Sequence, residues 1–148
     1  MVRLEEATEY DLLFMFNTRN IPEVYAGFYT QSAPLTWKEH FDWWKSRPSS
    51  WRSFVVYMDF MVVGVVNIGQ LCHWSPEIGY YVHPDHWGKG IGRTAVKQGL
   101  GVIRGHGKKY CHTTVLKTNE RSIRLLKSLG FKYMAEAREG EIWMTKEL

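Results

Sequence analysis

The hydrophobic and polar positions along the chain follow two different periods, which together predict a mixture of strands and helices. Apolar residues crowd residues 53–58, 61–68 and 77–82, a pattern typical of buried strands, and Asp59-Phe60 between the first two predicts a tight hairpin. Further strands are expected at residues 2–6, 109–116, 131–137 and 141–145, of which the last two form a closing hairpin.

Residues that start and stop helices mark the helical segments. Thr8 and Asp11 resemble a capping arrangement that opens an apolar helix. Residues 91–104 read as a helix in spite of two internal glycines, and residues 119–129 form another helix that ends at a glycine.

A second capping box, formed by Thr36 and the glutamate three residues later, follows an irregular connection over residues 19–35. The helix that it opens spaces Trp37, Phe41 and Trp44 at i, i+4 and i+7. These three side chains form one stripe of the helix, which is predicted to face the core. The order of all these elements predicts one mixed α/β (α+β) domain over residues 1–148.

The composition narrows the class of protein. Cys72 and Cys111 lie far apart without a CxxC spacing, so neither a disulfide framework nor a zinc site is expected, and His83 and His86 lack a third ligand. The start of the chain has no basic segment before an apolar run, and no apolar stretch is long enough to span a bilayer. We therefore expect a soluble, cytoplasmic protein that holds no metal and binds no membrane.

The net charge of +4 is unevenly distributed. Lysines and arginines gather at residues 89–93 and 104–132, which fits either a solvated helix face or an attractor for a polyanionic ligand. Since no recognised nucleic-acid-binding motif is present, a phosphorylated cofactor is expected rather than nucleic acid.

The stretch HPDHWGKGIGRTA, residues 83–95, joins a predicted strand to a predicted helix and contains Gly88, Gly90 and Gly92. Free backbone N–H groups at the start of a helix suit a phosphate or pyrophosphate, and glycine removes the Cβ atoms that hold a ligand away. The spacing fits neither G-x-x-x-x-G-K-[ST] of the P-loop nor G-x-G-x-x-G of the dinucleotide-binding fold.

With Trp87 at the position of the usual Gln or Arg, this loop resembles motif A, Q/R-x-x-G-x-G/A, of the GCN5-related N-acetyltransferases (the GNAT family). Residues 118–131 contain N-x-x-S-x-x-L-x-x-x-L-G-F, which is similar to motif B of that family. TEYDLLFMFNTRNIPEV near the start and EIGYYV before the loop resemble the RimJ/RimL-type branch. The resemblance spans nearly the whole chain. It implies a single GNAT-like domain with a mixed, mostly antiparallel twisted sheet, about four flanking helices, and acetyl-CoA as cosubstrate.

The resemblance also implies where acetyl-CoA binds. Backbone groups of Tyr81 and Val82 are expected beside the pantetheine arm, together with Asn119 and Ser122, and Asn119 is also expected to cap its helix. The phosphates are expected near these residues: Trp87, Gly88, Lys89, Gly90, Ile91, Gly92, Arg93, Thr94, Arg124 and Lys127.

The implied reaction is direct transfer of an acetyl group from the thioester to a primary amine in a ternary complex. The amine is mostly protonated at neutral pH, so the reaction needs a base. Glu77, on the strand before the glycine loop, is the expected base, with His73 and His112 as alternatives.

The leaving thiolate needs a proton donor. The family often places a tyrosine four residues after the position of Ser122, but here that residue is Leu126. Ser122 is therefore expected to hydrogen-bond the sulfur, and Tyr133, Tyr110 or a water are the further candidates.

The acceptor is expected beside the tryptophan-bearing helix, and the candidate substrate-binding residues are His40, Trp43, Trp51 and Glu77. Two acceptors stay open: a protein or peptide N-terminal amine, as in the RimJ/RimL-type branch, and a small amine such as an amino-sugar nucleotide. From a different class, a non-catalytic module that binds CoA or nucleic acid also fits the charge. Either a monomer or a homodimer agrees with the sequence.

Overall fold

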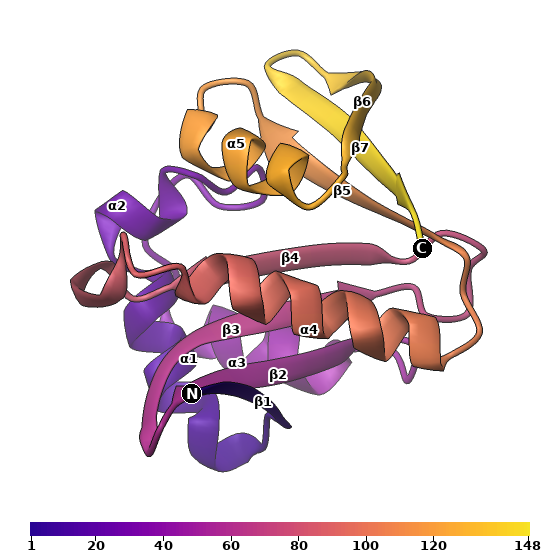
Figure 1. Cartoon of the computed structure of the whole chain (residues 1–148). Helices are drawn as coiled ribbons and strands as arrows, with labels where there is room; N and C mark the ends of the chain where they lie inside the picture. Colours follow the sequence, from indigo (N-terminus) through magenta and orange to yellow (C-terminus); the bar gives the residue numbers. More distant parts are fainter.

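Seven strands form one open sheet in the computed structural model, which describes the whole chain (Figure 1). The sheet order is β1-β2-β3-β4-β5-β7-β6, and every neighbouring pair is antiparallel except β4 and β5. The strands are β1 (Val2–Glu6), β2 (Arg52–Met58), β3 (Met61–Gly69), β4 (Glu77–Val82), β5 (Tyr110–Leu116), β6 (Lys132–Arg138) and β7 (Glu141–Glu147). The predicted strands and the mixed, mostly antiparallel sheet are confirmed, with strand ends that differ by at most two residues.

Helices cover both faces of the sheet (Figure 1). On one face α4 and α5 cover the larger hydrophobic core, which includes Val66, Ile78 and Met144. On the other face α1, α2 and α3 pack over a second core that includes Val55 and Val65. The helices are α1 (Leu12–Arg19), α2 (Pro22–Tyr25), α3 (Trp37–Ser46), α4 (Ile91–Gly105) and α5 (Glu120–Ser128). The four expected helices are present, and α2 adds a short one within the segment predicted to be irregular. None of them combines the length and the apolarity that crossing a membrane requires.

Capping residues start the helices at the positions that the sequence indicates. Thr8 and Asp11 form a capping box, although the chain first makes a 3₁₀ turn before α1 begins. Thr36 and Glu39 form a second capping box at α3, and the side chain of Asn119 caps α5. These local hydrogen bonds satisfy N–H groups that the helices themselves leave free.

The face that α3 turns to the core differs from the predicted one. Trp37 and Phe41 of the predicted stripe are 44% and 36% exposed, whereas His40 is fully buried. The Nε2–H of His40 donates to the carbonyl oxygen of Leu12 across 3.1 Å, which holds the His40 side of α3 against α1. The prediction that the aromatic stripe faces the core is therefore wrong for Trp37 and Phe41.

Strands β4 and β5 run parallel and pair at one position, Glu77 with His112. Beyond this pair the two strands diverge, and the sheet divides into a part with β1–β4 and a part with β5, β7 and β6 (Figure 1). The divergence leaves backbone N–H and C=O groups along one edge of β4 without a strand partner. This split in the sheet positions the candidate site.

Candidate active site

A cavity of about 1080 Å³ opens where β4 and β5 diverge. Its walls come from both parts of the sheet, from the loop after β4, from α5 and from the segment around α2. Most of the residues singled out in the sequence line it: Trp43, Trp51, Glu77, Tyr81, Val82, Trp87, Gly88, Gly90, Ile91, Gly92, Arg93, Asn119, Ser122 and Arg124. The fold thus brings residues from distant parts of the chain to one place.

The glycine loop after β4 presents an open backbone to the cavity. Gly88 and Gly90 have φ angles of +77° and +76°, and no atom lies within 4 Å of the place that a Cβ would take at either. Gly90 is the N-cap of α4 and no side chain caps this helix, so the N–H groups of its first turn have no acceptor within the helix. Arg93 in that turn also lines the cavity. These donors and this charge fit the pyrophosphate of acetyl-CoA.

Gly92 allows close packing beside the loop. A Cβ at this position would lie 3.2 Å from the ring of Tyr80 and 3.4 Å from Cδ1 of Leu125. The absence of a side chain therefore lets the first turn of α4 approach both β4 and α5.

Trp87, at the Gln or Arg position of motif A, is fixed by two contacts. Its Nε1–H donates to the carbonyl oxygen of Val82 across 2.7 Å, and the guanidinium carbon of Arg121 lies 3.5 Å from the centroid of a Trp87 ring. The ring thus ties the loop to the end of β4 and carries a cation from α5 on its face. Arg121 is absent from the residues predicted from the sequence, although it lies between Asn119 and Ser122 of motif B.

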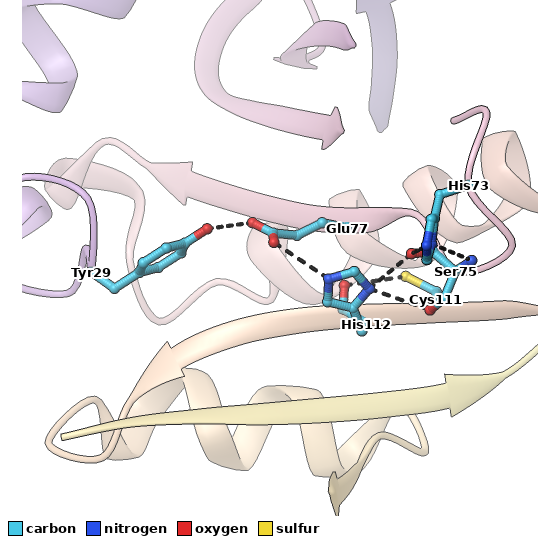
Figure 2. A network of polar contacts seen from close by, with 6 residues as sticks. All are labelled: Tyr29, His73, Ser75, Glu77, Cys111 and His112. Carbon is cyan, nitrogen blue, oxygen red and sulfur yellow. Dashed lines mark hydrogen bonds and ion pairs between the residues drawn. The ribbon is translucent and has the colours of Figure 1, made fainter. Parts of the chain in front are cut away.

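On one side of the split, Glu77 is the centre of a polar network (Figure 2). The hydroxyl of Tyr29 donates to Oε1 of Glu77 across 2.5 Å, and Nε2 of His112 lies 3.4 Å from Oε2 of Glu77. Nδ1 of His112 lies 2.9 Å from the carbonyl oxygen of Ser75, which only accepts, so this nitrogen carries a proton. The contact of Nε2 with Glu77 is favourable when Nε2 also carries a proton, which points at the carboxylate.

Burial and the two partners act on Glu77 in opposite directions. Burial raises the pKa of the Glu77 carboxyl, but the contacts with His112 and Tyr29 outweigh it, so this pKa lies below its ordinary value. Burial, together with the hydrogen bond to Glu77, raises the pKa of Tyr29, so the Tyr29 hydroxyl keeps its proton and donates it. Glu77 is thus an ionised carboxylate held between two partners at the cavity wall.

On the face that α4 and α5 cover, two hydroxyl groups form a pair at the cavity. The hydroxyl of Tyr80 lies 3.0 Å from Oγ of Ser122, and both residues line the cavity. Burial raises the pKa of Tyr80, so its hydroxyl stays protonated at neutral pH. Tyr80 is absent from the predicted residues, because strand alternation places it on the face opposite to Glu77. Leu126, at the position of the usual tyrosine, is 2% exposed and belongs to the core.

Five predicted residues do not line the cavity: His40, Lys89, Thr94, Lys127 and Tyr133. His40 is buried between α1 and α3, so its expected contact with the substrate is corrected to a role inside the fold. The hydroxyl of Thr94 donates to the carbonyl oxygen of Gly90 instead of facing the cavity. Tyr133 is 59% exposed on the edge strand β6, and the side chains of Lys89 and Lys127 are exposed.

The other candidates for the base and the acid differ in how close they lie to the cavity. None of His73, His112 and Tyr110 lines the cavity, but His112 contacts Glu77, which does. The ring of His73 accepts a hydrogen bond from the backbone of Ser75. Nowhere do three His, Cys, Asp or Glu side chains come together as metal ligands do.

Aromatic side chains form another part of the cavity wall, and the part beside α3 is the end where the acceptor is expected. Trp43 and Trp51 both line it, and the ring of Trp51 occupies the space beside Gly69, where a Cβ would lie 2.7 Å from the ring. Arg19 lines the same end, with its guanidinium carbon 5.2 Å from the centroid of a Trp43 ring. A planar or apolar acceptor fits between such walls.

The family model for the acetyltransferase (GNAT) domain matches residues 2–132. This match covers most of the chain, so the chain belongs to the GNAT family of acetyltransferases, whose cosubstrate is acetyl-CoA. The resemblance stated from motifs A and B is thereby confirmed, and so is the single GNAT fold.

The curated relatives of this chain are longer proteins, and the match covers only part of each. An uncharacterised protein of Methanocaldococcus jannaschii is 37% identical over 142 residues, which cover 93% of this chain and 29% of that protein. An L-amino acid N-acyltransferase of Escherichia coli is 38% identical over 60 residues, 40% of this chain and 35% of its own length. The chain therefore spans about a third of the length of the curated relatives that it matches.

Solved structures share the fold over the whole chain. A domain from Methanocaldococcus jannaschii superposes with a TM-score of 0.94 at 35% identity, covering 100% of this chain and 99% of that chain. Spermidine N-acetyltransferase from Vibrio cholerae, in complex with CoA and spermine, superposes with a TM-score of 0.87 at 19% identity, covering 99% and 95%. At this lower identity the likeness shows the fold alone.

Proposed function

We propose that this domain transfers an acetyl group from acetyl-CoA to a primary amine, with Glu77 as the base. The observation that carries the proposal is the Glu77 carboxylate held between Tyr29 and His112, in a cavity that also contains the open glycine loop. A protonated amine is not nucleophilic, so the reaction needs an ionised base within reach of it. The lowered pKa of Glu77 provides an ionised carboxylate at neutral pH.

Glu77 is the proton acceptor, and His112 and Tyr29 hold its carboxylate in place. As the new N–C bond forms, the amine proton passes to Glu77, directly or through one water. Nε2 of His112 faces one oxygen of the carboxylate, and the contact of its Nδ1–H with the carbonyl oxygen of Ser75 orients the ring. Tyr29 fixes the other oxygen of the carboxylate.

Tyr80 and Ser122 serve the leaving group. As the C–S bond breaks, the sulfur takes a proton from the hydroxyl of Tyr80, which Ser122 supports by a hydrogen bond. Tyr80 thus replaces the tyrosine that the family often has at the position of Leu126. The proposed donor to the thioester oxygen is the backbone N–H of Val82, on the edge of β4 that β5 leaves free, whereas the N–H of Tyr81 points to β3.

The proposed acceptor is a small amine. The relatives support this class, since the Escherichia coli protein is named for L-amino acids and the Vibrio cholerae enzyme for spermidine. Trp43 and Trp51 wall the acceptor end of the cavity, which suits a compact molecule such as an amino sugar or its nucleotide. A peptide N-terminal amine is the competing acceptor and belongs in the same assay.

The decisive experiment measures thiol release from acetyl-CoA with a panel of peptides, amino acids, amino sugars and polyamines. We expect Glu77→Gln to lower kcat by roughly 10²-fold to 10⁴-fold and to leave the Kd of acetyl-CoA unchanged. Glu139→Gln, in an exposed turn, is the matched control and should keep wild-type turnover.

Three results would contradict the proposal. Unchanged turnover in Glu77→Gln would remove Glu77 as the base. Binding of acetyl-CoA without thiol release from any amine would favour a non-catalytic CoA-binding module. Binding of oligonucleotide with a steep salt dependence, and none of acetyl-CoA, would favour a nucleic-acid-binding module.

A further inference from the structure

One charged side chain at the acceptor end of the cavity has no partner of opposite charge. Arg19, the last residue of α1, lines the cavity, and no carboxylate lies within 4.0 Å of its guanidinium nitrogens. Burial lowers the pKa of Arg19, because the guanidinium loses part of its hydration. A half-buried cation without an anion costs stability, so a role for it is expected.

Buried side chains hold Arg19 in one orientation. Its Nε donates to Oε1 of Gln31 across 3.1 Å, and its Nη1 donates to Nδ1 of His40 across 3.4 Å. Gln31 is 5% exposed and His40 is fully buried. The Nε2 proton of His40 is engaged by Leu12, which leaves Nδ1 free to accept. With Trp43 beside it, the guanidinium is oriented before any ligand arrives.

The remaining nitrogen of Arg19, Nη2, has no hydrogen-bond partner in the protein. Only two side-chain nitrogens are both buried and without a partner, Nε1 of Trp51 and Nδ1 of His86. Because Nη2 of Arg19 is not one of them, it is in contact with solvent. Free guanidinium N–H groups match the oxygens of a carboxylate or a phosphate.

We propose that Arg19 binds an anionic group of the acceptor, a carboxylate or a phosphate, while Glu77 receives the proton of its amine. This inference rests on the proposed function, since it names the class of the acceptor. Arg19 lies beside Tyr81, which shares one face of β4 with Glu77, and all three residues line one cavity. An acceptor with an amine and an acid group therefore meets a complementary charge at each end.

The other carboxylates at the cavity do not neutralise Arg19. Glu39 accepts hydrogen bonds from Thr36 in the capping box of α3, Glu120 pairs with Arg124, and Glu23 is exposed and forms no ion pair. A polyamine would place a positive charge against Arg19. We therefore expect spermidine to be a poor acceptor for this domain. In this respect the domain should differ from the Vibrio cholerae enzyme, which is named a spermidine N-acetyltransferase.

The test compares amines that differ only in the anionic group. L-Leucine is paired with L-leucinamide to probe a carboxylate, and glucosamine 6-phosphate is paired with glucosamine to probe a phosphate. The ratio of kcat/KM within each pair is measured for the wild type, Arg19→Gln, Arg19→Lys and Arg47→Gln. Comparing these ratios between variants cancels the intrinsic difference in reactivity of the two amines.

In the wild type we expect the acid-bearing member of one pair to have a kcat/KM about tenfold to a hundredfold higher than its neutral partner. Arg19→Gln should abolish this preference by lowering the kcat/KM of the acid-bearing amine more than that of its neutral partner, and Arg19→Lys should keep part of it. Arg47→Gln is the matched control, because Arg47 also stacks on tryptophan but does not line the cavity. The pair that shows the preference identifies the anion as a carboxylate or a phosphate.

If the wild type acetylates amines and its ratio of kcat/KM within each pair equals that of Arg19→Gln, the inference is overturned and the proposed function stands. If no amine is acetylated, the proposed function fails, and thermal stabilisation by each pair then reports on Arg19. Stronger stabilisation by the acid-bearing member in the wild type than in Arg19→Gln would support the anion site. Equal stabilisation of both proteins would exclude it.

Discussion

At Glu77, burial and polar contacts act against each other, and His112 is the larger of the two contacts that lower the pKa of the carboxyl. Without the imidazole, burial prevails, and the carboxyl binds its proton at higher pH. Glu77 must be ionised to receive the amine proton. We therefore expect His112→Leu to move the acid limb of the kcat profile, measured at saturating amine, to higher pH.

Two further variants separate the role of His112 from a loss of structure. Tyr29→Phe removes the other donor to Glu77 and should move the acid limb in the same direction. His112→Gln retains a neutral donor and should move it less than His112→Leu. An acid limb at the same pH in all three variants would contradict control of Glu77 by its neighbours, provided that the melting temperatures show folded proteins.

Tyr80 offers a residue-scale test of the leaving-group step. Tyr80→Phe keeps the ring that packs against Gly92 and removes the hydroxyl that contacts Ser122. We expect kcat to fall by roughly 10²-fold while the KM of acetyl-CoA changes little. Ser122→Ala, which leaves the phenol in place, should have a smaller effect. A wild-type kcat in Tyr80→Phe would assign the proton to another donor.

At the scale of the elements, β3 approaches β4 so closely that one position admits no side chain. A Cβ on Gly64 would lie 2.6 Å from the carbonyl oxygen of Tyr81 and 3.3 Å from Cα of Val82, both backbone atoms. Gly64→Ala must therefore push β4 aside. We expect it to lower the free energy of unfolding by about 1–3 kcal/mol, measured by urea denaturation, and to weaken acetyl-CoA binding.

The matched control for Gly64 lies on the exposed side of α4. A Cβ on Gly101 would meet no atom within 4 Å, and the residue is helical. Gly101→Ala should therefore raise the free energy of unfolding by up to about 1 kcal/mol, because alanine favours the helix. Equal effects of the two substitutions would contradict the close approach of β3 and β4.

The elements were predictable from the sequence because their signals are local. Capping boxes, strand alternation and the turn glycines each act within a few residues, and the glycine loop is defined by its place between a strand and a helix. Contacts that join distant elements were missed, among them the bond of Tyr29 to Glu77 and that of Tyr80 to Ser122. The buried face of α3 was misassigned because His40, which donates to Leu12, is buried there beside Trp43 and Trp44.

At the scale of the whole molecule, the cavity separates two parts of one sheet that β4 and β5 join at a single pair of residues. Few polar contacts cross it elsewhere. Asn119 Nδ2 donates to the carbonyl oxygen of Gly27 across 3.4 Å, the hydroxyls of Tyr80 and Ser122 pair, Nε of Arg93 donates to Oγ of Ser128, and Arg121 covers Trp87. A ligand between the parts therefore adds contacts that the free protein lacks. At a hundred times its Kd, acetyl-CoA should stabilise the fold by about 2.7 kcal/mol.

This stabilisation should be unequal across the molecule, which amide hydrogen exchange can resolve. We expect acetyl-CoA to slow exchange at residues 88–93 in the glycine loop and 119–125 on α5, which both contribute to the cavity wall, and to leave the pairing of β1 with β2 unchanged. Gly90→Ala should reduce this protection, because alanine at a φ of +76° is strained and its Cβ enters the space left for the ligand. Gly101→Ala should retain it. Protection confined to one side of the cavity would contradict a ligand that bridges both parts of the sheet.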